Sequence, residues 1–387
     1  MDRATEIALL DELLGLRQAR SAYLDEAVSE SPVARYLDQD RYARELDVLF
    51  RDRPVPLAHV SEVSEDGDFL VRRLAGVEVL LTRDRDGHAH AFLNVCRHRG
   101  MQLVPQDAGC RHRFTCPYHA WTWDNTGRLI GIPHREQGFP DLDLAGYGLK
   151  RVGVAEALGF VWVRMAGDVL PPAILAQHVG ALADDFTWIG MADLQVHAVS
   201  ERRWAANWKI LAEGGLEAYH FRVAHAKTIA GLFHDNLSTY EMLGGHVRSV
   251  LARRSVDDLA GMPRDQWSIR QHANLLYTLI PGPIFLVQSD HVVFLQILPE
   301  AVDQTTVRMV TLRPSGPLDE KAEGYWTRNH ALTEETLYED FEIGEKIQAG
   351  LASGANERLT FGRYEGALDR YNTEVEAALM PAREAAE

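Results

Sequence analysis

The chain has 387 residues, of which 46% are hydrophobic and 25% are charged, and its formal net charge is −16. Its length and composition are ordinary for a globular protein of two domains. The negative charge argues against nucleic acid as a partner, because affinity for nucleic acid depends on neutralising phosphates. No apolar run approaches the roughly 18–20 residues that cross a membrane, so we expect no membrane association.

The beginning of the chain and its cysteines bear on the cellular compartment. The first 20 residues alternate charged residues with leucine at helical spacing and lack the layout of a secretory signal. Three cysteines, Cys96, Cys110 and Cys116, are too few for a disulfide framework and lie among histidines. In an intracellular chain this pattern favours metal binding. We therefore expect a cytoplasmic protein with a metal site.

The predicted secondary structure divides the chain into three parts. Residues 1–50 have a helical, polar-faced pattern, and residues 51–167 read as a small all-β domain of short strands between turn signals. Residues 168–387 change to helix, then strands, then helix, which indicates an α+β domain. In this domain we predict helices near 173–190 and 207–221, strands at 246–253, 274–281, 283–290, 291–298 and 305–314, and two helices from Leu318 onward.

Two short loops of the all-β domain carry matched pairs of possible metal ligands. Each pair, Cys96 with His98 and Cys116 with His119, offers one thiolate and one imidazole from a tight turn. Two such turns can hold a small cluster from opposite sides, and a 2Fe–2S centre with two histidines carries both imidazoles on one iron. We predict that the cysteines bind the inner iron and the histidines the exposed iron.

Other interpretations of these loops remain open from the residues alone. Cys110 and His112 form a further Cys-x-His pair, but only three residues separate His112 from Cys116, too few for an opposing loop. We therefore treat Cys110 as a spare thiol. A zinc site could use the same two cysteines and two histidines. Four arginines make the loops basic, either as a docking surface for an acidic electron carrier or as partners of nearby carboxylates: Arg97, Arg99, Arg111 and Arg113.

The segment 207–225 is the second concentration of possible ligands. On one helix, Glu213, Glu217 and His220 would fall at i, i+4 and i+7 and share a face. His225 would then point away, so both histidines can bind one ion only if the helix ends or distorts just after His220. Two histidines and one carboxylate with open positions form the facial triad of oxygen-activating Fe(II) proteins. The alternative is a surface histidine and a core histidine with unrelated roles.

The residues at both sites resemble those of a known family. CRHRG at 96–100 and CPYHAW at 116–121 are similar to the Rieske signature of ring-hydroxylating oxygenases and their monooxygenase relatives. Asn-Trp-Lys at 207–209, Glu-Ala-Tyr-His at 217–220 and His225 resemble the catalytic-domain motif of the oxygenase (alpha) subunits of Rieske-type non-haem iron oxygenases.

The resemblance implies the fold, the third ligand and the cofactors. The fold is α+β, with a small all-β Rieske domain followed by a helix-grip domain of the START/Bet v1-like kind. The third iron ligand comes from a late helix, where Asp340 resembles the ligand and Glu339 and Glu342 are nearby rivals. The cofactors are a Rieske 2Fe–2S cluster and a mononuclear Fe(II) bound by His220, His225 and Asp340.

The family also implies how the two centres cooperate. The expected assembly is a homotrimer in which the cluster of one subunit faces the mononuclear iron of the next. Glu217 would bridge them by accepting hydrogen bonds from a cluster histidine, His98 or His119, and from His220. Electrons would come from a reductase that uses NAD(P)H and a flavin, either directly or through a ferredoxin, because the chain has no Gly-x-Gly-x-x-Gly after a strand. A competing interpretation is an electron-transfer protein whose second domain binds a ligand without catalysis.

The substrate expectation depends on Glu217. Most of the family has Asp there, and glutamate resembles the branch that oxidises quaternary ammonium compounds such as carnitine or glycine betaine. That branch commonly has Glu-Asn where this chain has Glu213 and Gly214. We expect hydroxylation or demethylation of a quaternary ammonium compound, and the alternative is mono- or dioxygenation of an aromatic acid or ring. The candidate aromatic contacts are Trp204, Phe221, Phe233, Tyr240, Tyr277 and Phe285, and Leu216, Leu232, Leu275 and Leu279 would suit an aromatic ring.

Overall fold

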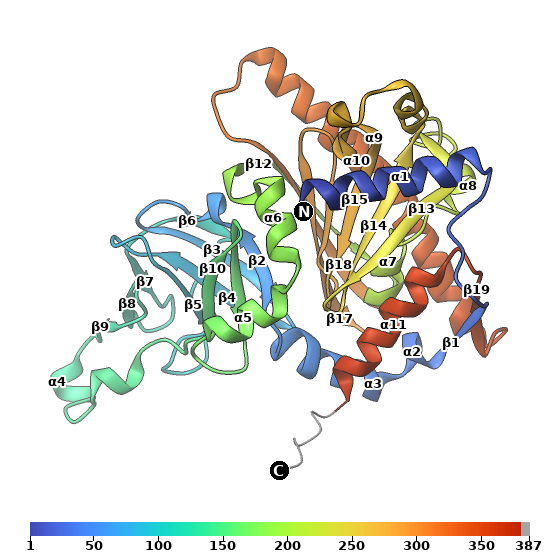
Figure 1. The fold of residues 1–387 in the computed structure, drawn as a ribbon. Coiled ribbons are helices and arrows are strands. Elements are labelled where there is room, and N and C mark those ends of the chain that lie inside the picture. The colour runs from blue at the N-terminus through green and yellow to red at the C-terminus, as the bar shows by residue number, and fades with distance from the viewer. Residues whose placement is uncertain (381–387) are drawn as a thin grey trace, which may run out of the picture. The chain divides into compact units, whose positions relative to one another are not determined.

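The computed structural model describes residues 1–380, which form two compact units (Figure 1). One unit is Phe50–His178, and the other combines Met1–Leu49 with the chain from Val179 onward. Within residues 1–380, no helix has both the length and the apolar character needed to cross a bilayer.

The unit Phe50–His178 consists mainly of short antiparallel strands. They pair in three sheets, in the orders β10-β11-β2, β5-β4-β3-β6 and β7-β8-β9. This arrangement confirms the predicted all-β domain. The strands are β2 (Val55–His59), β3 (Asp68–Leu74), β4 (Val77–Arg83), β5 (Ala89–Leu93), β6 (Ala108–Cys110), β7 (Arg113–Thr115), β8 (Thr122–Asp124), β9 (Leu129–Gly131), β10 (Gly153–Ala157) and β11 (Phe160–Arg164), and the α-helices are α4 (Arg135–Gly138) and α5 (Pro172–Val179).

The core of this unit includes two of the three cysteines. Cys96 and Cys116 belong to the same hydrophobic cluster as Phe114, Trp121 and Trp123. The cluster loops are therefore anchored in the interior by their cysteines, while the residues between the cysteines and histidines reach the surface.

The second unit is α+β, as predicted. Seven strands form one antiparallel sheet in the order β12-β18-β17-β16-β15-β14-β13. Its central strands are almost continuously buried, because helices cover them, whereas the edge strand β13 alternates buried and exposed residues. The strands are β12 (Leu194–Trp204), β13 (Phe233–Leu243), β14 (His246–Arg253), β15 (Ala273–Thr278), β16 (Ile284–Val287), β17 (Val292–Ala301) and β18 (Gln304–Pro314), with the separate pair β1 (Ser29–Pro32) and β19 (Arg358–Phe361).

Helices pack on this sheet and carry the site described below. The long helix α10 (Glu320–Ala352) contacts β12 and α7 (Trp208–Glu213), and α7 contacts β17. The C-terminal helix α11 (Gly366–Leu379) contacts β13 and β14 (Figure 1). The other α-helices are α1 (Arg3–Gln18), α2 (Ala34–Leu37), α3 (Gln39–Glu45), α6 (Leu182–Ile189), α8 (Phe221–Ala224) and α9 (Ile269–His272).

The predicted elements differ from the structure in a few places. The helix expected over 173–190 is two helices, α5 and α6, because Gly180 between them has a φ of +45°. The edge strands β12 and β13 were not predicted, since their partly exposed residues weaken the apolar pattern. The N-terminal segment contains β1 as well as helices. The two helices predicted from Leu318 are α10 and α11, and residues 381–387 lie outside the described part of the chain.

A buried ionic contact anchors the start of α7. The Lys209 ammonium lies 2.6 Å from a carboxylate oxygen of Glu45, and the indole of Trp208 donates to the same carboxylate at 2.8 Å. Burial lowers the pKa of Lys209 to about 8, although Glu45 opposes that shift. Because both charged groups are almost fully buried, removing Glu45 would leave the Lys209 ammonium without its ion-pair partner, whereas Glu45 also pairs with Arg41 at 2.8 Å.

Glu213, the last residue of α7, belongs to a second buried group. The hydroxyl of Tyr36 donates to both carboxylate oxygens at 3.0 Å, and the amide of Asn372 donates at 2.9 Å. Burial raises the pKa of Glu213 to about 7 despite these hydrogen bonds. Glu213 therefore tethers α7 to α2 and α11 and does not share a face with Glu217 and His220, contrary to the helical projection.

Replacing Glu213 with Gln should flatten the dependence of stability on pH. A carboxyl pKa raised from 4.5 to about 7 in the folded state contributes stability that is fully present below pH 4.5 and lost as the pH rises through 7. Between pH 5 and 8 the free energy of unfolding of the parent should fall by on the order of 2–3 kcal/mol more than that of Glu213→Gln. Urea unfolding midpoints across this range measure the difference, and parallel curves for the two proteins would contradict it.

Candidate metal centres

The two cysteine loops of the all-β unit have the same backbone geometry. The amide of Gly100 donates to the carbonyl of Cys96 at 3.0 Å, and the amide of Ala120 donates to the carbonyl of Cys116 at 3.0 Å. Gly100 and Ala120 have φ values of +75° and +57°, so each loop turns back through a left-handed residue. The equal geometry explains why two differently spaced pairs, Cys-x-His and Cys-x-x-His, present equivalent donors.

The loops place the thiols inside and the imidazoles at the rim. Cys96 and Cys116 are 3% and 2% exposed, and burial, together with the adjacent Cys116 thiol, raises the pKa of Cys96. The half-buried rings of His98 and His119 lie 4.7 Å apart, and Trp121 stacks on His98. Nδ1 of His98 is buried and has no hydrogen-bond partner among the described residues. Such an unpaired nitrogen, facing a second imidazole, has the character of a metal ligand.

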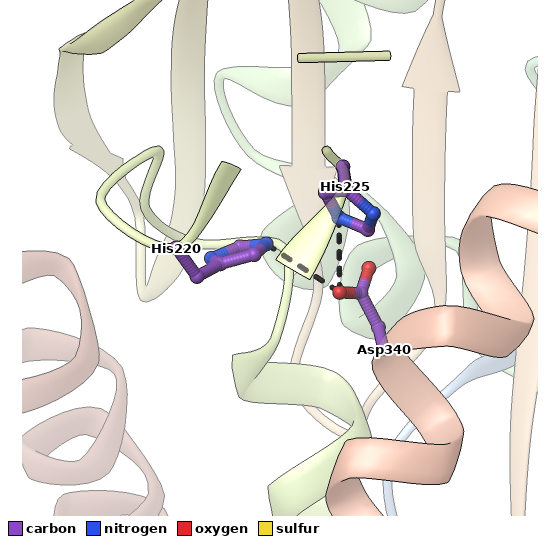
Figure 2. A group of neighbouring side chains, drawn as sticks. All are labelled: His220, His225 and Asp340. Atoms are coloured by element: carbon purple, nitrogen blue, oxygen red, sulfur yellow. Dashed lines mark ion pairs between the residues drawn. The ribbon is translucent and has the colours of Figure 1, made fainter. Parts of the chain in front are cut away.

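A second group of donors, His220, His225 and Asp340, comes together in the other unit (Figure 2). Nε2 of His225 lies 3.0 Å from Oδ1 of Asp340, and Nε2 of His220 lies 3.5 Å from the same oxygen. Nε2 of His220 is buried and makes no hydrogen bond to a described residue. Within residues 1–380 this is the one group of three histidine, cysteine or carboxylate ligand atoms that all lie within 4.8 Å of one another.

The chain between α7 and α8 explains how both histidines reach Asp340. The helix predicted through 221 ends at Glu213 instead, so this prediction is wrong. A Cβ on Gly215 would lie 2.6 Å from a methyl carbon of Leu276, so glycine lets this turn approach the sheet without displacing that side chain. Glu217 then accepts hydrogen bonds from the amides of Tyr219 and His220, which compete with continued helix.

Each histidine is held by a carboxylate on its other nitrogen. Nδ1 of His220 lies 2.5 Å from Oε1 of Glu217, and Nδ1 of His225 lies 2.8 Å from Oε2 of Glu339. The hydroxyl of Thr228 donates to the same oxygen of Glu339 at 2.6 Å. A carboxylate on the outer nitrogen fixes the tautomer and ring orientation of a metal-binding histidine. Both rings therefore present Nε2 to the centre of the group.

The electrostatics of this group favour a cation. Burial lowers the pKa values of His220 and His225, but the neighbouring carboxylates outweigh burial and raise both pKa values above their usual range. Glu339 lies behind His225, whereas Asp340, the next residue of α10, faces the histidines. Consecutive helical residues point in different directions, which allows this division. Glu342, the other candidate for the third ligand, is exposed.

Replacing Glu339 with Ala should weaken Fe(II) binding without affecting the all-β unit. Loss of a carboxylate behind a metal-binding histidine typically lowers affinity by roughly 10- to 100-fold. Titration of the metal-free protein with Fe(II) measures this change, and Glu342→Ala is the matched control on the exposed side of α10. Equal Fe(II) affinity of Glu339→Ala and the parent would show that Glu339 does not support the site.

A cavity of about 520 Å³ adjoins the group of three. His225 and Asp340 line it, together with Phe221 and Phe233, whose rings lie 5.3 Å apart. Leu232 is the one residue of the four predicted leucines that lines it. Other apolar lining residues, which the sequence did not single out, are Ile229, Leu251, Leu276, Leu286, Leu332 and Leu337.

The remaining aromatic candidates contact other parts of the unit. Trp204 packs against Tyr338 and Phe341 of α10. The hydroxyls of Tyr240 and Tyr277 donate to Asp25 and Asp185, and Phe285 stacks on Phe294. None of these four lines the cavity.

Comparison with protein families assigns both units. Residues 53–151 match the model of the Rieske [2Fe-2S] domain, and residues 191–380 match the model of the ring hydroxylating alpha subunit (catalytic domain). The glycine betaine monooxygenase oxygenase subunit of Chromohalobacter salexigens is 33% identical over 234 residues, 60% of this chain and 52% of the relative. The chlorobenzene dioxygenase subunit alpha of a Cupriavidus species is 29% identical over 214 residues, 51% of this chain and 45% of the relative. The chain thus spans about half the length of these curated relatives.

Solved structures share the fold of the whole chain. The quaternary ammonium Rieske monooxygenase CntA in complex with L-carnitine has a TM-score of 0.76 at 20% identity, covering 91% of this chain and 95% of that chain. Naphthalene 1,2-dioxygenase from a Rhodococcus species has a TM-score of 0.75 at 20% identity, covering 98% of both chains. With its Rieske domain followed by a ring-hydroxylating catalytic domain, the chain belongs to the family of Rieske-type ring-hydroxylating oxygenases.

Proposed function

We propose that this chain is an oxygenase component that uses O2 and electrons from an NAD(P)H-dependent reductase to hydroxylate or demethylate a small organic substrate. The observation that carries the proposal is the group His220, His225 and Asp340 at the wall of a 520 Å³ cavity. An electron-transfer protein has no need for such a group. The donor set of two imidazoles and one carboxylate fits Fe(II), which when bound supplies the site of O2 activation.

In the all-β unit, Cys96, His98, Cys116 and His119 would hold a Rieske 2Fe–2S cluster. The adjacent thiols and the adjacent imidazoles form two pairs, as the two irons of such a cluster require. The ligands of one tetrahedral zinc would all lie close to one another. In the described chain, the ligand atoms of these four residues do not form a group whose members all lie within 4.8 Å of one another. The three cysteines form no disulfide, which is consistent with the reducing cytoplasm as the compartment.

The residues around the proposed iron hold and shield it. Glu217 and Glu339 accept the outer protons of the two histidines, so that Nε2 of each ring stays available. Phe221 and the leucines of the cavity keep water from the reacting part of the substrate.

Glu217 would also connect the two centres in a homotrimer. Its side chain is 11% exposed, so part of it stays accessible to a histidine of a neighbouring subunit after binding His220. Electrons would arrive from a reductase with a flavin, either directly or through a ferredoxin, and the electron donor would dock near the basic residues of the cluster loops. Arg97, Arg111 and Arg113 are exposed there, which leaves their charges accessible to an acidic carrier.

A quaternary ammonium compound is the leading substrate class. Glu217 and the similarity to glycine betaine monooxygenase oxygenase subunits support it, and Phe221 and Phe233 offer aromatic faces at the wall of the cavity. The leucine-rich middle of the cavity favours the second candidate, an aromatic acid.

Substrate-coupled O2 consumption with a competent reductase tests the function. Betaines and carnitine should drive O2 uptake with equivalent product, and benzoates are the comparison panel. If O2 consumption were tightly coupled to product formation with an aromatic acid and with no ammonium compound, aromatic acids would become the leading substrate class. No coupled uptake with any compound of either class would contradict the oxygenase function.

A further inference from the structure

The cavity beside His225 and Asp340 is elongated, and its two ends differ chemically. One stripe of α10 lines it from Asp340 to Tyr325, and 15 residues of α-helix span roughly 22 Å. The middle is apolar, as described above. The far end is polar and is lined by Arg253, Asn274, Gln288, Asp290, His291, Tyr325 and Asn329.

Arg253 is the half-buried cation of this polar end, whereas Arg254, which also lines the cavity, is exposed. It is the last residue of β14, two positions after Leu251, and both side chains line the cavity. Its Nε donates to Oδ1 of Asn274 at 2.8 Å, and a terminal nitrogen donates to the same oxygen. Within the described residues, Arg253 forms no ion pair with a carboxylate, and burial lowers its pKa. Its half-buried charge is therefore balanced only by a neutral amide and by more distant groups.

The nearest acidic residue is already committed to other partners. Oδ1 of Asp290 lies 2.7 Å from Nδ1 of His291, and Oδ2 accepts the hydroxyl of Tyr325 at 2.5 Å. These hydrogen bonds, His291 first, lower the pKa of Asp290 to about 2. Asp290 thus attaches the start of α10 to the β16–β17 turn and attracts Arg253 only through space. The guanidinium keeps donors available for an anion that enters the cavity.

We propose that Arg253 binds a carboxylate group of the substrate, with Asn274 orienting the guanidinium. The inference rests on the proposed function, because it places the oxidised carbon beside His225 and Asp340, at the opposite end. The substrate is then an acid whose carboxylate and oxidised carbon are separated by an apolar spacer that contacts Leu251, Leu276 and Leu332. Trimethylammonio acids and aryl acids share this chemistry, whereas neutral arenes lack it.

Binding of matched probes to the iron-loaded protein without reductant tests the inference. The probes are trimethylammonio-alkanoates of increasing chain length, arylalkanoates, and the amide of each acid. Calorimetry should show tighter binding of acids than of amides. Acid affinity should increase with chain length from glycine betaine through γ-butyrobetaine to longer trimethylammonio-alkanoates, because γ-butyrobetaine is much shorter than the roughly 22 Å that α10 spans along the cavity. Arg253→Gln should weaken acid binding by roughly 10- to 100-fold and leave amide binding unchanged. The affinity of Arg253→Lys for the acids should lie between those of the parent and Arg253→Gln, because lysine keeps the charge but lacks the planar guanidinium that binds a carboxylate through two hydrogen bonds.

Arg203→Gln removes the same charge from an exposed position of β12 and should bind every probe as the parent does. Unfolding temperatures of the variants check that Arg253→Gln is folded. Equal affinity of the parent for acids and amides, or equal acid affinity of Arg253→Gln and the parent, would overturn the inference.

The inference and the proposed function fail in different ways. Arg253-dependent binding of acids without O2 consumption in the reductase assay would contradict the oxygenase function alone. Coupled O2 consumption with a neutral substrate, at the same rate in Arg253→Gln, would uphold the oxygenase function and contradict the carboxylate site.

Discussion

Glu217→Gln should keep the iron content and the cluster spectrum of the parent. The rate of product formation in a single turnover should fall by about 100-fold or more, at or above the upper end of the range typical for partners of metal ligands. The amide oxygen can still accept the proton of His220 Nδ1, which lies 2.5 Å from Glu217 in the parent. The variant loses the negative charge and one of its two acceptor oxygens, because the NH2 group that replaces this oxygen can only donate. The expected defect is therefore in communication between the centres rather than in metal binding.

Product formed per chain after mixing the reduced protein with substrate and O2 measures this defect. Glu342→Gln is the control, because it removes an exposed carboxylate that contacts neither histidine. A parent-like single-turnover rate in Glu217→Gln would show that Glu217 is not the bridge. Loss of mononuclear iron from the variant would instead assign Glu217 to metal binding.

Cys116→Ser should abolish the cluster, whereas Cys110→Ser should leave it intact. Cys116 is buried next to Cys96 in the core, and serine provides no thiolate for the inner iron. Cys110 is exposed on β6, where its thiol donates to the backbone carbonyl of Asp66. The low average g value of a histidine-ligated 2Fe–2S centre in the electron paramagnetic resonance spectrum reports the outcome.

The two cysteine variants also decide between a cluster and zinc. Protein prepared anaerobically with iron supplied should be red-brown. Colourless protein with one tightly held zinc per chain would contradict the cluster assignment. Disappearance of the signal in Cys110→Ser would contradict the choice of ligands.

The sequence predicted the elements whose residues carry a local signal. The strands β14 to β18 have continuous apolar, β-branched runs because both faces are covered. The predicted ranges overlap all five, although 274–281 and 283–290 run three residues past the ends of β15 and β16. The loop pairs Cys96/His98 and Cys116/His119 could be identified because each is a compact motif. Asp340 needed the family resemblance, because Glu339 and Glu342 are chemically similar neighbours in the same helix.

Other features depended on contacts that spacing does not encode. The backbone that follows α7 approaches Leu276 at Gly215, and Leu276 lies 61 positions away in the chain. The role of Glu339 depends on its direction from α10 toward His225, which only the fold determines. Arg253 lies in an ordinary strand pattern, and its place in the cavity follows from the packing of α10 over the sheet.

Iron and acid-labile sulfide content per chain tests the central claim most directly. A chain with both centres should contain about three iron atoms and about two sulfides, because a 2Fe–2S cluster and one mononuclear iron are present together. His225→Ala should lower the iron content to about two per chain and leave the sulfide unchanged. Two iron atoms per chain in the parent, unchanged by His225→Ala after full reconstitution, would contradict the account and indicate an electron carrier.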